Sequence, residues 1–345
     1  MIKNIKKTRF WKHLISFLIL PIFKFFWKNI INLHGRILYF FYFKRGHKQY
    51  SEYFLKNDDK KIIRNVSLFK EITEEINKNL TEEFLLSMKK KIVESKFPEG
   101  HYLSKKENFK IDMFQYLNSE TRKKIFNFAL SDLNLNIVSN YFGVMPVISN
   151  LYLSLNVPVE GEKERGSMLW HRDGFGFKCL DLFIPIRKLN EDNGPLFYQK
   201  KINKMGVFHR YTDVLKNAKE GERNKIAIAA FENNQENNID YFSGNVGDGI
   251  FLDSFSCYHR GGFCKKNDRL MLRITYQTPD STAFKNPNSF KNISSVDDLE
   301  KIKNNLDIFK KYSAFKRSKL FSILHIQEIL LKFYGLMHFK DDKAT

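Results

Sequence analysis

Residues 150–157 read Asn-Leu-Tyr-Leu-Ser-Leu-Asn-Val, and their pattern indicates the fold class. Leucine alternates with a polar or aromatic residue at a period of two, which predicts a strand with one buried face. Four further runs have the length and composition of strands: Cys179–Ile186, Gly194–Tyr198, Gly249–Leu252 and Leu270–Gln277. Turn residues separate these runs, and no crossover helix is predicted between them. We therefore expect a mainly β core over about residues 148–278, built as a sandwich or a barrel.

Helical patterns flank this core on both sides along the chain. Apolar residues recur at helical spacing in four segments: residues 68–95, 119–132, 296–310 and 318–339. In the first segment, Thr81-Glu-Glu-Phe84 has the composition of a helix start. The sequence thus predicts a β core with flanking α-helices.

The chain divides into three parts by composition. Residues 1–50 form a basic, aromatic extension, residues 51–295 hold the predicted domain, and residues 296–345 hold the C-terminal helices. Within the domain, residues 199–245 are polar and rich in Asn and Lys. We expect this long stretch to decorate the core rather than to form part of it.

The composition excludes several classes of protein. The chain has 345 residues, of which 43% are hydrophobic, so it can bury a large core and is not wholly disordered. Its three cysteines rule out a disulfide scaffold and favour a reducing compartment, so we expect a cytoplasmic protein. No CxxC pair is present, which argues against a cysteine zinc site.

The positive charge is concentrated at the two ends of the chain. The net charge is +20; residues 1–50 have eight Lys, three Arg and no acidic residue, and residues 310–345 add a net +5. The intervening 51–309 has a net charge of only +4. A nucleic-acid-binding domain needs its basic surface on the fold itself, so we expect no nucleic-acid partner.

Residues 1–50 combine this charge with many aromatic side chains, including Trp11, Trp27 and Tyr39. The longest apolar run, Leu14–Phe23, is shorter than the roughly 18 to 20 residues that a membrane span needs. Two interpretations remain open. The segment either lies in a membrane interface as a peripheral anchor, or packs its aromatic side chains on the domain.

The residues that suggest chemistry lie inside the β region. In Trp170-His171-Arg172-Asp173-Gly174, His171 and Asp173 are two positions apart and would share one face of an extended strand. His259 follows 86 residues after Asp173. Two histidines and one carboxylate form the facial triad of non-heme Fe(II) oxygenases, which leaves coordination positions open for a co-substrate and dioxygen.

An arginine that could anchor an anion follows this triad after a short loop. Arg269 lies ten residues after His259 and opens a predicted strand. It can pair through two hydrogen bonds with the far carboxylate of a 2-oxo acid. Arg273 lies on the same face of that strand, so it is an alternative anchor.

Together these pieces resemble the phytanoyl-CoA dioxygenase family of Fe(II)- and 2-oxoglutarate-dependent oxygenases. The matching segments begin at Trp170, Asp192 (Asp-Asn-Gly-Pro-Leu), Gly247 (Gly-Asp-Gly-Ile-Phe-Leu-Asp-Ser) and His259 (His-Arg-Gly-Gly), and they cover about 130 residues of the 345. The resemblance implies a double-stranded β-helix, or jelly roll. It also implies an iron ion on His171, Asp173 and His259, and 2-oxoglutarate on Arg269.

Other functions fit the same motifs less well. A kinase catalytic loop would have Asn where this chain has Lys178, and a halogenase of this superfamily would lack Asp173. A nucleic-acid demethylase would have a second Arg at Thr275. A jelly roll that only binds its ligand stays open as well. The favoured hypothesis is a dioxygenase that hydroxylates a small molecule, or a substrate of the lipid or glycan type.

Overall fold

The computed structural model describes residues 47–55, 60–94, 109–158, 166–173, 179–200 and 239–278, together with Arg36 and Tyr39. The described strands are β1 (Lys60–Ile63), β2 (Lys110–Asp112), β3 (Val147–Asn156), β4 (Cys179–Pro185), β5 (Leu196–Gln199), β6 (Ile239–Phe242), β7 (Gly249–Leu252), β8 (His259–Gly261) and β9 (Arg269–Gln277). They form two antiparallel sheets. The larger has the order β1-β7-β4-β9-β3-β2, and the smaller has the order β6-β5-β8.

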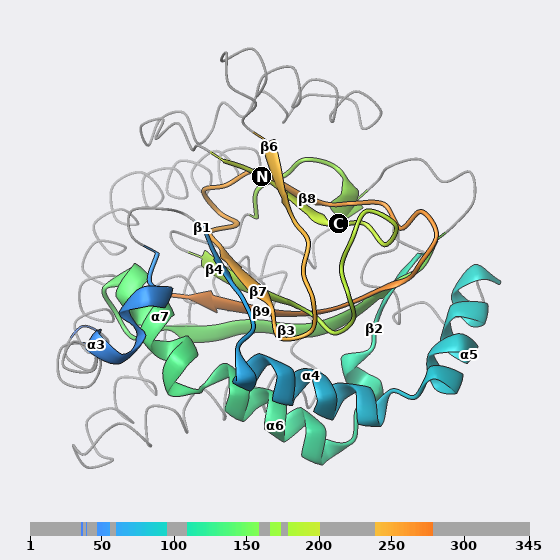
Figure 1. Cartoon of the computed structure of the whole chain (residues 1–345), viewed down its shortest axis with the longest axis horizontal. Coiled ribbons are helices and arrows are strands. Elements are labelled where there is room, and N and C mark those ends of the chain that lie inside the picture. The colour runs from blue at the N-terminus through green and yellow to red at the C-terminus, as the bar shows by residue number, and fades with distance from the viewer. Residues whose placement is uncertain are drawn as a thin grey trace, which may run out of the picture.

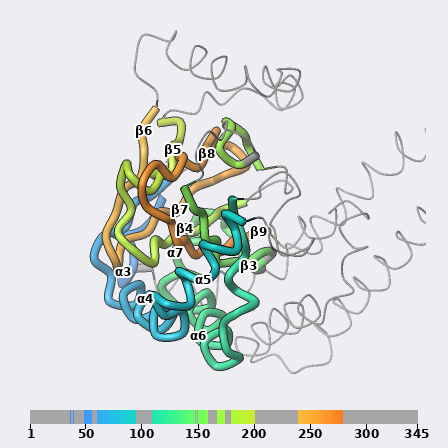
Figure 2. The backbone as a smooth tube through the Cα atoms, turned by 90° about the vertical axis from the view of Figure 1, so that its right-hand side faces the viewer, coloured from blue at the N-terminus to red at the C-terminus, as the bar shows by residue number. Residues whose placement is uncertain are grey.

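The helices lie on one side of the larger sheet, and the smaller sheet lies on the other (Figures 1 and 2). The helices are α3 (His47–Tyr50), α4 (Ser67–Asn79), α5 (Glu82–Val93), α6 (Ser119–Ala129) and α7 (Asp132–Phe142), with the 3₁₀ turns η3 (Ser51–Tyr53), η4 (Phe114–Tyr116) and η5 (Gly166–Met168). The larger sheet is therefore a central layer with two different faces.

The period-two pattern of the long strands assigns their side chains to these faces. On β9, Leu270, Leu272, Ile274 and Tyr276 belong to the core cluster shared with the helices. The hydroxyl of Tyr276 donates a hydrogen bond of 2.7 Å to the carbonyl of Ala129 in α6. Because alternate side chains point to opposite faces, the odd-numbered residues of β9 face the smaller sheet.

A second apolar cluster fills part of the space between the two sheets. It joins Phe183, Ile250 and Met271 of the larger sheet to Leu196, Tyr198 and Phe242 of the smaller one, and it includes the buried Cys257. Other inward positions of the larger sheet are polar, among them Asp181, Arg269 and Arg273, and these are described with the site below. The space between the sheets thus has an apolar part and a polar part.

Capping residues set the helix boundaries. The side chains of Thr81, Asn118 and Ser131 accept hydrogen bonds from backbone N–H groups in the first turns of α5, α6 and α7. The cap at Thr81 divides the helical segment predicted over 68–95 into α4 and α5, because the backbone of Thr81 is extended. The helix predicted over 119–132 is present as α6 and ends at Ala129.

The fold is thus mixed α/β with antiparallel sheets, and the five predicted strands are present. One expectation about residues 199–245 is wrong: Ile239–Phe242 pairs with β5 along its whole length, so the end of this stretch belongs to the core. The helices predicted over 296–310 and 318–339 lie outside the described residues, as does nearly all of 1–50. No described helix is both long enough and apolar enough to cross a membrane.

Candidate functional site

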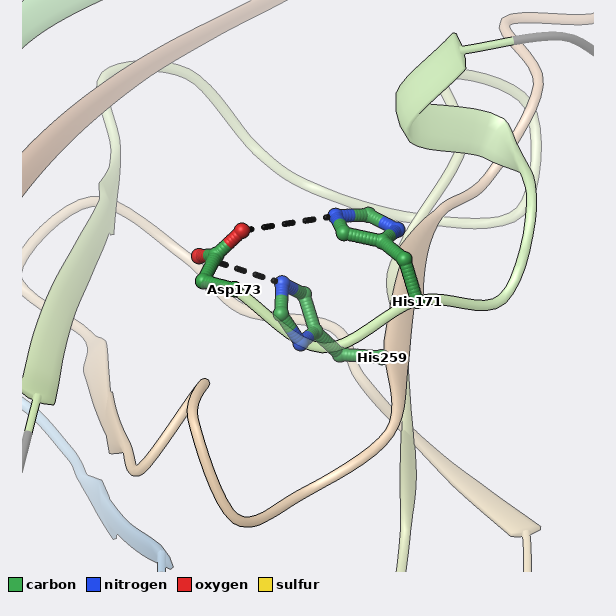
Figure 3. Close-up of side chains that lie close together, drawn as sticks. All are labelled: His171, Asp173 and His259. Atoms are coloured by element: carbon green, nitrogen blue, oxygen red, sulfur yellow. Dashed lines mark ion pairs between the residues drawn. The ribbon is translucent and has the colours of Figure 1, made fainter. Parts of the chain in front are cut away.

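The three residues of the predicted triad converge in space (Figure 3). His171 and Asp173 lie between η5 and β4, and His259 is the first residue of β8. Nε2 of His171 is 3.8 Å from Oδ1 of Asp173, and Nε2 of His259 is 3.7 Å from Oδ2 of the same carboxylate. One ligand atom from each residue lies within 4.8 Å of the other two.

Backbone hydrogen bonds hold these residues together across the chain. His171 and His259 form an antiparallel bridge, in which each N–H donates to the other carbonyl at 3.0 and 2.9 Å. The N–H of Asp173 donates to the carbonyl of Ser254 at 2.8 Å. The placement of the side chains therefore follows from pairing of the main chain, which does not require a bound ion.

The two imidazole rings are held by the same kind of hydrogen bond, from Nδ1 to a backbone carbonyl. Nδ1 of His171 is 2.6 Å from the carbonyl of Leu169, and Nδ1 of His259 is 3.1 Å from the carbonyl of Cys257. A carbonyl only accepts, so each Nδ1 carries a proton, and each Nε2 is the ring nitrogen directed at Asp173. This is the tautomer in which histidine binds a metal through Nε2.

The electrostatics of the site favour a neutral histidine beside an ionised carboxylate. Burial and the neighbouring His259 lower the pKa of His171 to about 3, so its ring is neutral near pH 7. Burial alone would raise the pKa of Asp173, but Arg273 and the two histidines hold that pKa well below its usual range. Metal ligands must be deprotonated, and both groups are in that state.

The spacing suits a metal ion. Three ligand atoms on one face of an octahedron, at bonds of about 2.1 Å, lie about 3 Å apart. The distances of 3.8 and 3.7 Å join the two histidines to different oxygens of Asp173, and one ligand atom from each residue lies within 4.8 Å of the other two, so side-chain movements would have to bring the three atoms closer together around an ion. Two imidazoles and one carboxylate are the donor set of facial-triad Fe(II) sites. His171, Asp173 and His259 therefore fit such an ion.

Arg269 lies between the sheets, in the same part of the fold as His259. It is 7% exposed, and its guanidinium donates to the carbonyls of Gly194 and Gly262, the latter at 3.1 Å. Nη2 lies 3.0 Å from the point where a Cβ on Gly261 would be. Gly261 follows His259 by two residues on β8, which corresponds to about 7 Å along the strand. Among the described residues, no ion pair joins Arg269 to a carboxylate.

Three glycines lie around this guanidinium: Gly194 and Gly262 accept its hydrogen bonds, and Gly261 leaves it room. A side chain on Gly261 would press against Arg269, as its position shows. Gly194 has a φ of +76°, and a Cβ there would lie 2.3 Å from the carbonyl oxygen of Gly262. The motifs Asn193-Gly194-Pro195 and His259-Arg-Gly-Gly262 thus meet in space, and together they supply the carbonyls that bind the guanidinium of Arg269.

Arg273, the alternative anchor, has a different environment. Its Nε and Nη2 donate to the two carboxylate oxygens of Asp181, at 2.8 and 2.7 Å. Nη2 also donates to Oδ2 of Asp173, and Nη1 donates to the hydroxyl of Tyr152 at 3.0 Å. Burial would lower the pKa of Arg273, but Asp173 and Asp181 keep that pKa well above its usual value. This arginine therefore already contacts two carboxylates.

The structure adds polar residues that the sequence patterns did not single out. Lys110, Asn156 and Arg269 are register partners on β2, β3 and β9, so their side chains form one inward row. Lys110 and Asn156 are 9% and 2% exposed, and Oδ1 of Asn156 has no hydrogen-bond partner within the part of the chain that the structure describes. A lysine opening a strand as short as β2 gives no signal in sequence. Asp181 does give a signal in the sequence, because a carboxylate inside an apolar strand needs a buried partner.

Comparisons with known proteins add limited information. No protein-family model and no curated protein sequence matches the chain, so the resemblance to the phytanoyl-CoA dioxygenase family is not confirmed. Among solved structures, the non-heme α-ketoglutarate-dependent epimerase SnoN from nogalamycin biosynthesis is 12% identical, with a TM-score of 0.41 over 68% of this chain and 81% of that chain. The carbocyclase SnoK from the same biosynthesis is 12% identical (TM-score 0.40; 66% and 83%), and AviO1 from Streptomyces viridochromogenes Tue57 is 13% identical (TM-score 0.40; 68% and 95%). Because these scores are low, we base the function on the site alone.

Proposed function

We propose that the chain is an Fe(II)- and 2-oxoglutarate-dependent dioxygenase that hydroxylates a small molecule, and that its two sheets are those of a double-stranded β-helix. The observation that carries the proposal is the convergence of His171, Asp173 and His259, with both Nε2 atoms directed at one carboxylate. A triad of this kind leaves one side of the metal open for a co-substrate and dioxygen. Fe(II) held there supplies dioxygen activation coupled to oxidative decarboxylation of the 2-oxo acid.

Arg269 is the proposed anchor for the distal carboxylate of 2-oxoglutarate. Gly261, which Arg269 contacts, lies about 7 Å along β8 from His259, and this separation suits a five-carbon dicarboxylic acid whose other end reaches the metal. The neighbouring Asn156 and Lys110 extend this end of the site into a row with two cationic groups. Among the described residues, the hydrogen bonds of this buried guanidinium go to carbonyls, and an anionic ligand would add a charge-assisted pair, which is strong where water is excluded.

The protein's own residues then have distinct tasks. The backbone bridge between His171 and His259 keeps the metal ligands in place before any ligand binds. Arg269 orients the co-substrate so that its 2-oxo end faces the triad. The apolar cluster around Phe183 and Met271 excludes water from the neighbouring space between the sheets.

The alternative of a jelly roll that only binds its ligand is less well supported. Such a protein has no need for two histidines in the Nε2-presenting tautomer or for an ionised Asp173 between them. A nucleic-acid demethylase is disfavoured by the low net charge of residues 51–309. For the substrate we propose a small molecule, of the lipid or glycan type if residues 1–50 attach the protein to a membrane surface.

The test is an anaerobic titration of the full chain with Fe(II) and then 2-oxoglutarate, followed by exposure to air. We expect a visible charge-transfer band when 2-oxoglutarate is added, and succinate once dioxygen is present. The Asp173→Ala variant is the control and should show neither. Tight Fe(II) binding by the wild-type chain without a band or succinate would overturn the proposal and favour a binding protein.

A further inference from the structure

We infer that Arg273 and Asp181 form a bracket that positions the metal ligand Asp173: Asp181 neutralises and fixes Arg273, and Arg273 fixes the orientation of the Asp173 carboxylate. This inference rests on the proposed metal centre and adds two positioning residues to it. Neither residue is needed as a ligand, because the triad is complete without them.

The hydrogen bonds of Arg273 use four of the five N–H donors of its guanidinium. Its guanidinium uses Nε and Nη2 on both oxygens of Asp181, Nη2 also on Asp173, and Nη1 on Tyr152. It comes from the middle of β9, where Phe183 of β4 and Tyr152 of β3 are its register partners. The side chain is therefore fixed on both sides of its strand.

Asp181 is the fully buried end of the bracket. Its side chain is 0% exposed and also accepts a hydrogen bond from Oγ1 of Thr275 on β9. A carboxylate so deeply buried is tolerated only with a cation and hydrogen bonds around it, and Arg273 and Thr275 provide both. Asp181 is not part of the cluster of ligand atoms formed by His171, Asp173 and His259, so its charge acts on the site through Arg273.

The consequence for Asp173 is control over its two oxygens. Arg273 holds Oδ2, which also lies 3.7 Å from Nε2 of His259, and leaves Oδ1, 3.8 Å from Nε2 of His171, as the oxygen without an arginine contact. A carboxylate held in this way binds a metal through one atom, and the positions that a second oxygen would take stay open. Partners that orient a metal ligand in this way commonly change metal affinity by about 10- to 100-fold when they are replaced.

The balance of charge makes the role of Asp181 testable. In the wild-type chain, Arg273 shares its single positive charge between two carboxylates. If Asp181 is neutralised, Arg273 pairs with Asp173 alone and competes with the metal for that carboxylate. Removing the arginine charge as well should relieve this competition. The bracket therefore predicts that a second substitution, at Arg273, restores part of the metal affinity that the first one removes.

The experiment measures Co(II) binding to the full chain by calorimetry and by the visible spectrum of the bound ion, without 2-oxoglutarate or turnover. We expect Asp181→Asn to bind Co(II) about 10-fold or more weakly than the wild-type chain. The double variant Asp181→Asn/Arg273→Gln should recover part of that loss, because it removes the competing charge but also the contact that orients Asp173. Arg269→Gln, a buried arginine on the same face of β9, is the matched control and should keep wild-type Co(II) affinity.

Three results would overturn the inference. The first is wild-type Co(II) affinity and spectrum in a folded Asp181→Asn variant. The second is a double variant that binds Co(II) as weakly as the sum of its single substitutions, since a merely structural role gives no rescue. The third is a wild-type chain that binds no Co(II) or Fe(II), which would overturn the proposed function together with the bracket.

Discussion

Replacing Arg269 with Gln should weaken the binding of 2-oxoglutarate strongly while leaving metal binding intact. Arg269 is 7% exposed, so its pair with a carboxylate would form largely away from water. Hydrogen bonds to charged groups contribute about 1.5–3 kcal/mol. Since about 1.4 kcal/mol corresponds to a factor of ten, the dissociation constant should rise by about 10- to 150-fold. The Arg269→Lys variant should be intermediate, because it keeps the charge but loses the planar pair of donors.

The assay is an anaerobic titration of the Fe(II)-loaded chain with 2-oxoglutarate, in which the charge-transfer band reports binding. Pyruvate is the matched ligand control, because it has the same 2-oxo carboxylate and lacks the distal one. Arg269→Gln should therefore leave the affinity for pyruvate unchanged. The structural reason is the separation of about 7 Å along β8 between Gly261, which Arg269 contacts, and the metal ligand His259.

Two outcomes would refute this reasoning. Equal losses for pyruvate and 2-oxoglutarate would show that the substitution disturbs the metal end of the site. Unchanged affinity for 2-oxoglutarate in Arg269→Gln, together with a large loss in Arg273→Gln at saturating Fe(II), would move the anchor to Arg273. The contacts of Arg273 with Asp173 and Asp181 argue against that second outcome.

Three further predictions concern the surroundings of the site. Gly261→Ala places a methyl group 3.0 Å from Arg269 Nη2, so 2-oxoglutarate titration should show weaker binding while Co(II) affinity is kept. Gly194→Ala combines a φ of +76° with a contact of 2.3 Å to Gly262, and denaturant unfolding should show a loss of about 2–4 kcal/mol. Because the pKa of His171 is lowered to about 3, its imidazole takes up a proton below about pH 6.5 in the unfolded chain but stays neutral in the folded chain until about pH 3. The metal-free protein should therefore lose about 1.4 kcal/mol per pH unit between about pH 6 and 5, and His171→Asn should remove this slope in unfolding curves; an equal slope in the variant would assign it to another group.

The parts of the fold that were predictable are those in which local pattern and tertiary pairing agree. Residues 150–157 alternate at a period of two, and in β3 the leucines face the helices while the intervening residues face the smaller sheet. Helix α6 has both an amphipathic pattern and the cap Asn118. In each case one stripe of apolar residues meets one buried surface, so the sequence alone contains the signal.

Elements that depend on their partners were not predictable in the same way. Strands β2 and β8 have only three residues each, and they exist because β3 and β5 offer paired edges. Helix α7 begins Asp-Leu-Asn-Leu-Asn-Ile137, an alternation typical of a strand. It is helical because Ser131 caps it and because its asparagines Asn134 and Asn136 are buried with hydrogen bonds to nearby carbonyls. Such contacts override the local pattern.

The residues of the site also divide into those that local sequence reveals and those that only tertiary pairing brings together. His171 and Asp173 were found because two residues of special chemistry stand close together in the sequence, and His259 because a strand and an arginine follow it. Arg273 and Asp181 are 92 positions apart, and only the register of β4 against β9 brings them together. Yet the run Cys179–Pro185 is buried at every position and contains one carboxylate. Because an isolated buried charge is strongly unfavourable, Asp181 alone implies a cation on the neighbouring strand, and Arg273 is the inward-facing arginine within its reach. A lone acid in an apolar strand is therefore evidence for a polar network, even where its partner is far away in the chain.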